Sequence, residues 1–146
     1  MILLAQNSIT PLILAASLTA AAALAHFMCL VFGAPAFRLL GAGEPIARMA
    51  ENGHWYPPVI AFVIGSVLTL WVAYALGAAG LIAPLPLTRY ALWGIATFFL
   101  LRAVCFPLLI PAFPGNSMLF WWSTSVACLI LGVAYLIGAW NFWTTH

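Results

Sequence analysis

Long apolar runs dominate the chain, and short polar or proline-rich segments separate them. Each run is long enough for a helix to cross the hydrocarbon core of a bilayer, which takes about 20 residues. The runs are continuous rather than alternating, and an open sheet cannot satisfy its backbone in lipid. The sequence therefore predicts an all-α polytopic membrane protein, a four-transmembrane-helix bundle forming a single domain over residues 1–146. The expected spans cover about residues 11–32, 58–82, 88–110 and 118–142.

Breaker residues agree with these boundaries. Pro57-Pro58 can open the second helix, because a missing N–H is harmless in the first turn. Pro84 and Pro86 separate the second span from the third, and the segment 111–117 turns the chain before the fourth. The first run is expected to be a retained membrane helix rather than a signal peptide, since no basic residue precedes it.

Composition places the chain in lipid. Of its 146 residues, 66% are hydrophobic and 4% are charged, whereas a soluble domain carries roughly 25% charged residues. The net charge of +2, without any basic stripe, excludes nucleic-acid binding. The expected partners are the lipid bilayer and either another membrane protein or further copies of this chain.

Aromatic residues are expected to mark the two membrane–water interfaces, which Trp and Tyr favour. Four crossings place Trp55, Tyr56, Trp121 and Trp122 on one side, and Tyr90, Trp140 and Trp143 on the other. Arginine counting favours a cytoplasmic first loop, because Arg38 and Arg48 lie in it whereas Arg89 marks the other side. We expect a multi-pass protein of the bacterial inner membrane.

The first connection, residues 33–57, holds most of the charge. Part of it is expected to form a short helix along the interface, with Glu44 near its positive N-terminal end. Arg48 and Glu51 would lie on its polar face. His54 beside Glu51 is the nearest approach to an acid/base pair, and we interpret both as ordinary interfacial polar groups.

Arg102 is a charged residue inside an expected span, and three interpretations stay open. Its side chain extends alone to the interface, it forms an ion pair with Glu44 or Glu51, or it binds a ligand directly. An ion pair would make the first loop a lid over the bundle. Pro107 and Pro111 interrupt the span close to Arg102, as in many transporters, but the chain shows no inverted repeat.

Regularly spaced small and polar residues are expected to form the faces along which the helices pack. The first span carries Ala15, Thr19, Ala22, His26, Cys29 and Gly33. The second carries Gly65, Thr69, Ala73 and Gly77, and the fourth carries Ser125, Cys128, Gly132 and Tyr135. The third carries Ala91, Ile95, Phe98, Arg102 and Cys105, which predicts that Arg102 faces protein rather than lipid.

His26 and Cys29 share one helix face at a spacing that suits a ligand pair. Zinc needs four ligands, and haem held by two helices would want a second histidine in mid-membrane, which no other span offers. We therefore expect no metal and no cofactor, with His26 hydrogen-bonded across helices. No catalytic residue is expected either, because the chain has no Asp and no paired carboxylate within a span.

The general plan resembles that of small uncharacterised four-helix membrane proteins of bacteria. The resemblance rests on LAHF in the first helix (24–27), the first loop, FLLRAVCF in the third helix (99–106) and the Trp-rich start of the fourth. It covers most of the chain, implies the four-helix fold, and implies no activity and no residue roles.

Three functions follow from these patterns. The first is a non-catalytic integral membrane protein that acts as an accessory subunit or binds a partner through its small-residue faces. The second is an oligomeric carrier or binder of a small or lipidic ligand, with a pocket near Arg102, His26 and Cys29 that the first loop closes. The third is a membrane enzyme or haem protein.

Overall fold

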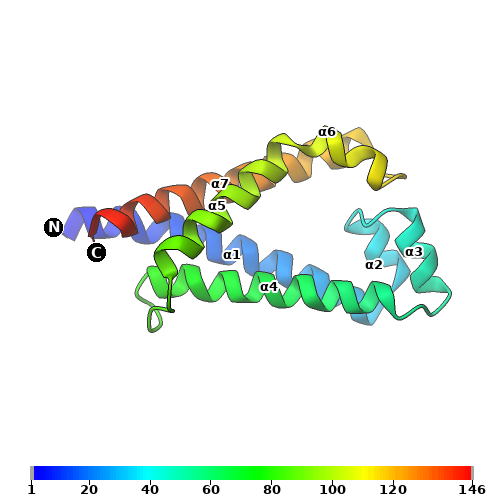
Figure 1. The fold of residues 1–146 in the computed structure, drawn as a ribbon, viewed down its shortest axis with the longest axis horizontal. Coiled ribbons are helices and arrows are strands. Elements are labelled where there is room, and N and C mark those ends of the chain that lie inside the picture. The colour runs from blue at the N-terminus through cyan, green and yellow to red at the C-terminus, as the bar shows by residue number, and fades with distance from the viewer. Residues whose placement is uncertain (1, 146) are drawn as a thin grey trace.

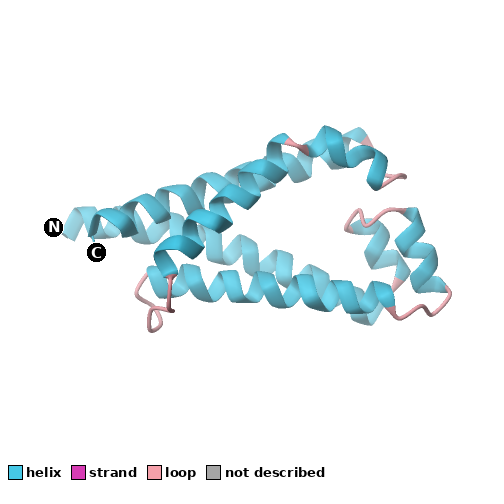
Figure 2. Ribbon diagram, in the orientation of Figure 1, coloured by secondary structure: helices cyan, strands magenta, loops and turns pink. Residues whose placement is uncertain are grey.

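The computed structural model describes the backbone of residues 2–145 and the side chains of residues 9–144, and this part of the chain contains helices and no strand. The long helices are α1 (Ile2–Phe32), α4 (Tyr56–Ala78), α5 (Thr88–Val104) and α7 (Met118–Thr145). The short ones are α2 (Ala34–Leu39), α3 (Glu44–Glu51), α6 (Phe106–Leu109) and the 3₁₀ helix η1 (Ile110–Ala112). The all-α prediction is confirmed (Figure 2).

Three helices are long and apolar enough to cross a membrane: Ile9–Phe32 of α1, all of α4, and Met118–Thr144 of α7. The 17 residues of α5 rise only about 25 Å, which is less than the hydrocarbon core of about 30 Å. The segment reaches the required length only together with α6 and η1, which are bent from α5 by 72°.

Pro107 accounts for this bend. It has no N–H to bond the carbonyl of Ala103, and its ring clashes with that carbonyl in a straight helix. Cys105 still donates its N–H to Leu101 O, at 2.8 Å, but its own backbone has left the helical region, with φ −84° and ψ 9°. The helix expected over residues 88–110 therefore ends at Val104.

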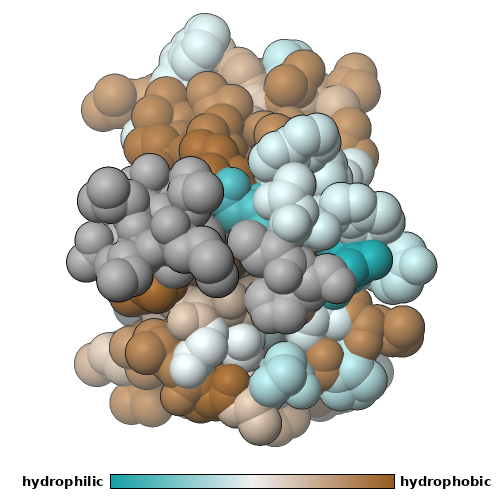
Figure 3. All heavy atoms as spheres, turned by 90° about the vertical axis from the view of Figure 1, so that its left-hand side faces the viewer, coloured by the Kyte–Doolittle hydropathy of each residue, from teal (hydrophilic) through white to brown (hydrophobic). Residues whose placement is uncertain are grey.

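The long helices form two pairs, α1 with α4 and α5 with α7, which are joined where α1 packs against α7. Figure 1 shows the two pairs lying close together at the end that carries both termini. They diverge toward the opposite end, where α2 and α3 lie. Figure 3 looks onto the terminal end and shows hydrophilic atoms between apolar surface above and below.

Tyr135 of α7 ties the two pairs together in the core. Its ring is fully buried and stacks on Phe99 of α5, with ring centroids 5.9 Å apart. Thr19 of α1 lies 3.1 Å from the Tyr135 hydroxyl, which donates in turn to Trp71 O of α4 at 3.4 Å. Thr19 and Tyr135 therefore lie on packing faces, as their spacing predicts.

On the fourth span, Ser125, Gly132 and Tyr135 of the expected packing face are buried. In α4 the prediction is wrong at Thr69, which is exposed and donates its hydroxyl to Gly65 O at 2.8 Å. The buried side of α4 includes Ala61, Gly65, Leu68 and Ala75. Residues that are spaced alternately three and four apart, as on α7, stay on the side of the helix that faces one neighbour. Residues spaced four apart throughout, as in the series predicted for α4, shift progressively around the helix.

The α5 face is also only partly as predicted. Ile95 is buried, but Phe98 is 52% exposed and Phe99 beside it is buried instead. Phe98 packs its ring edge against Trp71 of α4, with centroids 5.1 Å apart, so it lies at the margin of the core. Arg102 is partly buried, in the last turn of α5.

Two glycines of the long helices provide a matched test of this packing. A Cβ on Gly132 would lie 2.7 Å from Leu100 Cγ and 3.1 Å from the Leu100 backbone nitrogen, whereas a Cβ on Gly94 meets nothing within 4 Å. We expect Gly132→Ala to lower the free energy of unfolding by about 1–3 kcal/mol through overpacking. Gly94→Ala should raise it by about 0.5–1 kcal/mol. Equal effects on unfolding in detergent micelles would contradict this packing.

Candidate functional site

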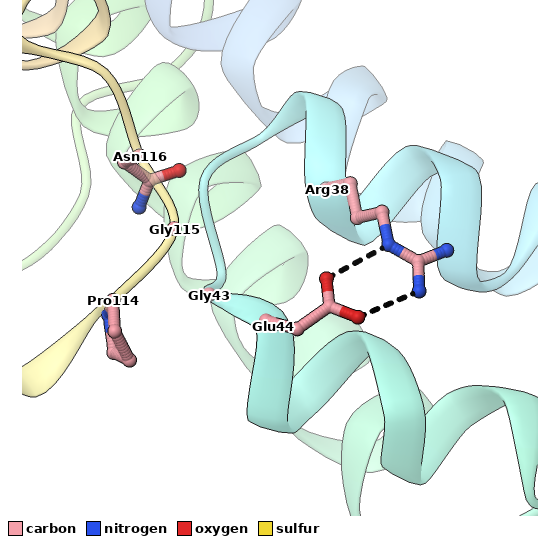
Figure 4. Close-up of a pocket in the computed structure, with 6 residues that line it drawn as sticks. All are labelled: Arg38, Gly43, Glu44, Pro114, Gly115 and Asn116. Carbon is pink, nitrogen blue, oxygen red and sulfur yellow. Dashed lines mark hydrogen bonds and ion pairs between the residues drawn. The ribbon is translucent and has the colours of Figure 1, made fainter.

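The charged residues of the first loop neutralise one another. Arg38 of α2 donates to both carboxylate oxygens of Glu44, each at 3.0 Å, and to Glu51 at 2.7 Å. Arg48 donates to Glu44 from one turn further along α3, at 3.1 Å. Figure 4 shows the two-pronged contact between Arg38 and Glu44 across the turn that joins α2 to α3.

This network sets the protonation of Glu44. Hydrogen bonds from Arg38 first, and then from Arg48, lower the pKa of the Glu44 carboxyl to about 2. The same contacts with Glu44 and Glu51 raise the pKa of Arg38. The loop thus keeps its charges, and its two arginines balance its two glutamates.

Helix α2, which supplies Arg38, is absent from the elements predicted from the sequence. The signal was present, because α2 and α3 begin alike: a glycine with positive φ precedes each helix, and a proline lies in its first turn. Proline favours the first turn of a helix. The motif around Gly33 and Pro35 matches the one around Gly43 and Pro45.

The first loop docks onto the turn between η1 and α7. Glu44 donates its backbone N–H to Pro114 O at 3.2 Å, and Asn116 donates its side-chain amide to Gly41 O at 3.0 Å. Gly41 has φ +71°, and a Cβ there would overlap the Phe120 ring. Gly43 has φ +88° and packs against the Phe113 backbone. These contacts require glycine on the loop side.

A polar cavity of about 130 Å³ lies at this junction, lined by Arg38, Gly43, Glu44, Pro114, Gly115 and Asn116 (Figure 4). It has room for a few water molecules. Arg38 and Glu44 already neutralise each other there. The cavity therefore presents no unpaired charge to a ligand.

The ion pair between Arg102 and Glu44 or Glu51, one of the three interpretations that the sequence leaves open, does not form. Both carboxylates bind Arg38 instead, and Arg102 forms no salt bridge with any side chain in residues 9–144. The physical reason is proximity along the chain, because the α2–α3 turn brings Arg38 against the glutamates at little entropic cost.

Arg102 faces α7, as its position on the helix predicts. Its guanidinium carbon lies 5.4 Å from the centre of the Trp121 ring, within the range of a cation–π contact. Its Nη1 atom is buried and has no hydrogen-bond partner. A side chain that simply extends to the interface would keep this group in water.

Two side-chain polar atoms of α7 are likewise buried without a hydrogen-bond partner. Trp121 is 2% exposed and Ser125, one turn further along, is 5% exposed. Trp121 Nε1, Ser125 Oγ and Arg102 Nη1 are the buried side-chain polar atoms without a hydrogen-bond partner in the described part of the chain. We refer to Arg102, Trp121 and Ser125 as the Arg102 cluster.

Trp121 is the residue of this cluster that the sequence pattern assigned only to an interfacial aromatic belt. Trp55 and Trp122 are 70% and 58% exposed, as expected of interfacial aromatics. Trp121 instead points inward and stacks against Phe106 of α6, with centroids 6.5 Å apart. The sequence contains a signal for the inward position of Trp121. Trp121 precedes Ser125 by four residues, so the two share the face of the fourth span that the spacing predicts to be packed.

His26 and Cys29 do not join the Arg102 cluster by any hydrogen bond. His26 Nδ1 donates to Ala22 O at 2.8 Å, so the expected bond across helices is wrong for this atom. The Cys29 thiol donates to Ala25 O at 3.7 Å. No group of three or more His, Cys, Asp or Glu in the described residues is placed to hold a metal ion.

The remaining predicted site residues lie at the loop end. His54 is exposed, and its backbone N–H bonds to Met49 O at 2.9 Å. Glu51, which precedes His54 by three residues, is bound to Arg38. Cys128 is half-buried on the packing face of α7.

No known protein family, curated protein or solved structure matches this chain. The resemblance to small four-helix bacterial membrane proteins therefore stays a prediction. Function has to be inferred from the geometry of the chain's own residues.

The Glu44 network predicts a pH dependence of folding. The pKa of Glu44 is about 2 in the folded protein and ordinarily 4.5, so its contribution is complete above about pH 5. It is lost as the pH falls through the folded value. We expect the free energy of unfolding to decrease between pH 5 and 2, and Glu44→Gln to reduce that decrease. An equal pH dependence in both proteins, measured by unfolding in detergent, would contradict it.

Proposed function

We propose that this chain is a non-catalytic, four-span protein of the bacterial inner membrane that binds a small or lipidic ligand at the Arg102 cluster. The docked first loop covers the end of the bundle that holds the cluster. This is the carrier or binder function among the three that the sequence suggests. The observation that carries it is the set of three buried polar atoms without partners.

The position of the termini supports four crossings. Both ends of the described chain lie opposite the first loop (Figure 1), which favours an even number of crossings. With α1, α4 and α7 as three of them, the α5–α6 segment would be the fourth. A short or bent span is accommodated by local thinning of the bilayer. Arginine counting favours a cytoplasmic first loop.

The ligand hypothesis rests on the cost of leaving polar groups unpaired. An unsatisfied buried donor costs about 1–3 kcal/mol, and more if it is charged. Nearly all buried polar groups in folded proteins therefore have a partner. Arg102, Trp121 and Ser125 have none within the described residues, so a bound group is their natural complement.

The first loop lies where it would act as a cover. Gly41 packs directly against the Phe120 ring, and Phe120 immediately precedes Trp121. Asn116 and the backbone of Glu44 hold the loop to the turn before α7. Loop docking and the Arg102 cluster therefore share the first turns of α7.

Native mass spectrometry of the protein, extracted gently from its own membrane, tests this function. We expect the wild type to carry a discrete non-protein mass, and Trp121→Phe and Ser125→Ala to lose at least half of it. Each substitution removes a polar atom of the cluster and leaves most of the side-chain volume. Ser123→Ala is the control, because Ser123 is exposed and bonds to Phe120 O. A bare wild-type chain would refute the proposal.

The accessory-subunit function has one observation in its favour. Gly94 lies on the exposed side of α5 with open space around it, and Thr97 one turn away is exposed as well. Small residues on a lipid-facing surface allow another helix to approach closely. A membrane-protein partner seated here would explain why α5 has a glycine where it contacts nothing.

A substitution at Gly94 distinguishes this second candidate. If a partner protein co-migrates with the chain at a fixed ratio in native mass spectrometry, Gly94→Leu should abolish the complex by blocking close approach. Ser66→Leu, on the exposed surface of α4, is the control and should retain it. A complex that survives Gly94→Leu would exclude this face as the interface.

A further inference from the structure

We propose that the Arg102 cluster recognises an oxyanion, the carboxylate or phosphate group of its ligand. This inference rests on the proposed ligand site and names the chemistry that the site would accept. It follows from the distribution of charge over the whole chain and from the kinds of polar atom in the cluster.

The chain cannot neutralise Arg102 with its own acidic side chains. Glu44 and Glu51 are its only two Asp or Glu residues. Both are bound to Arg38, and Glu44 also to Arg48. That network is neutral by itself, so a carboxylate could pair with Arg102 only by breaking its bonds to the arginines of the loop.

The fourth arginine provides a contrast. Arg89, at the start of α5, lies over the Trp143 ring with its guanidinium carbon 4.3 Å from the ring centre. The start of α5 lies near the end of the molecule that carries the termini (Figure 1), and none of the polar atoms of Arg89 is both buried and unpartnered. Arg102 makes a longer cation–π contact, at 5.4 Å, and its Nη1 is buried and unpaired.

The cluster offers donors and almost no acceptors. A guanidinium and an indole N–H can only donate, and a serine hydroxyl can donate as well as accept. A group that is rich in acceptors and negatively charged satisfies all three at once. Carboxylate and phosphate groups match the planar, two-pronged geometry of arginine, and such charge-assisted bonds are stronger than neutral ones.

The surroundings hold the donors in position. The Trp121 ring contacts Arg102 and stacks on Phe106, which restricts its rotation. Ser125 lies one turn from Trp121 on the same helix, and residues four apart are neighbours on a helix surface. Trp121 and Ser125 are buried, and a low local dielectric strengthens a paired charge as much as it penalises an unpaired one.

Such an oxyanion has two possible sources, an amphiphile anchored in the bilayer or a soluble anion. Binding to purified, delipidated full-length protein in a neutral maltoside detergent separates them. The probes are dodecyl phosphate and dodecanoate, their soluble counterparts inorganic phosphate and acetate, and uncharged dodecanol. The readouts are the bound mass in native mass spectrometry and the shift in melting temperature.

We expect at least one of the anionic probes to bind wild-type protein and to raise its melting temperature, and dodecanol to do neither. Arg102→Gln should weaken anion binding at least tenfold. Arg102→Lys should weaken it less, because it keeps the charge and loses the two-pronged geometry. Arg89→Gln is the control and should bind as the wild type does. Binding of the soluble anions would identify a soluble source, and binding of the dodecyl anions alone a lipidic one.

Three results would overturn the inference. If dodecanol binds as tightly as the anions, the ligand site stands but its chemistry is not anionic. If no probe binds and no native mass is found, buried water satisfies the cluster, and the proposed function falls as well. Should Arg102→Gln fail to fold, Trp121→Phe keeps an aromatic ring and removes the indole N–H, and anion binding equal to wild type would then count against the cluster.

Discussion

One constraint governs this structure. Every polar group in an apolar environment needs a hydrogen-bond partner within the protein. Helices meet that need for the backbone, because each N–H bonds to a carbonyl of the same segment. Side chains on the long helices follow the same rule, as Thr69, Thr97 and His26 each bond to the carbonyl four residues back. The Arg102 cluster departs from this rule, which is why it attracts a functional interpretation.

The same need explains how charge is organised. Glutamates are few, and the first loop uses both of them to neutralise its own arginines. The loop can then dock against the start of α7 through backbone bonds and glycine contacts, without an unpaired charge at the junction. Arg102 is left without an acidic partner, only a few residues before the break in the third apolar segment.

The break itself connects packing to the site. Pro107 turns α6 away from α5 and sets Phe106 against Trp121. A straight third helix would carry this aromatic side chain in another direction. The contact between Phe106 and Trp121 therefore depends on a proline that also shortens the span.

Much of the architecture was predictable because lipid imposes strict length and hydropathy on a helix. The positions of the long apolar helices, the short helix that begins at Glu44 and the inward direction of Arg102 all follow from spacing and composition. Repeats of four and three also placed Thr19, Ser125 and Tyr135 on packing faces. These features depend on local periodicity, which a sequence displays directly.

Tertiary structure decided which groups meet. The sequence shows that two glutamates must serve four arginines, but only the folded turn between α2 and α3 gives both to Arg38. It shows that Trp121 is aromatic and near a helix start, but only the packing of α5, α6 and α7 turns it inward to Arg102. Partner choice depends on distances between segments remote in sequence, and local periodicity carries no information about those distances.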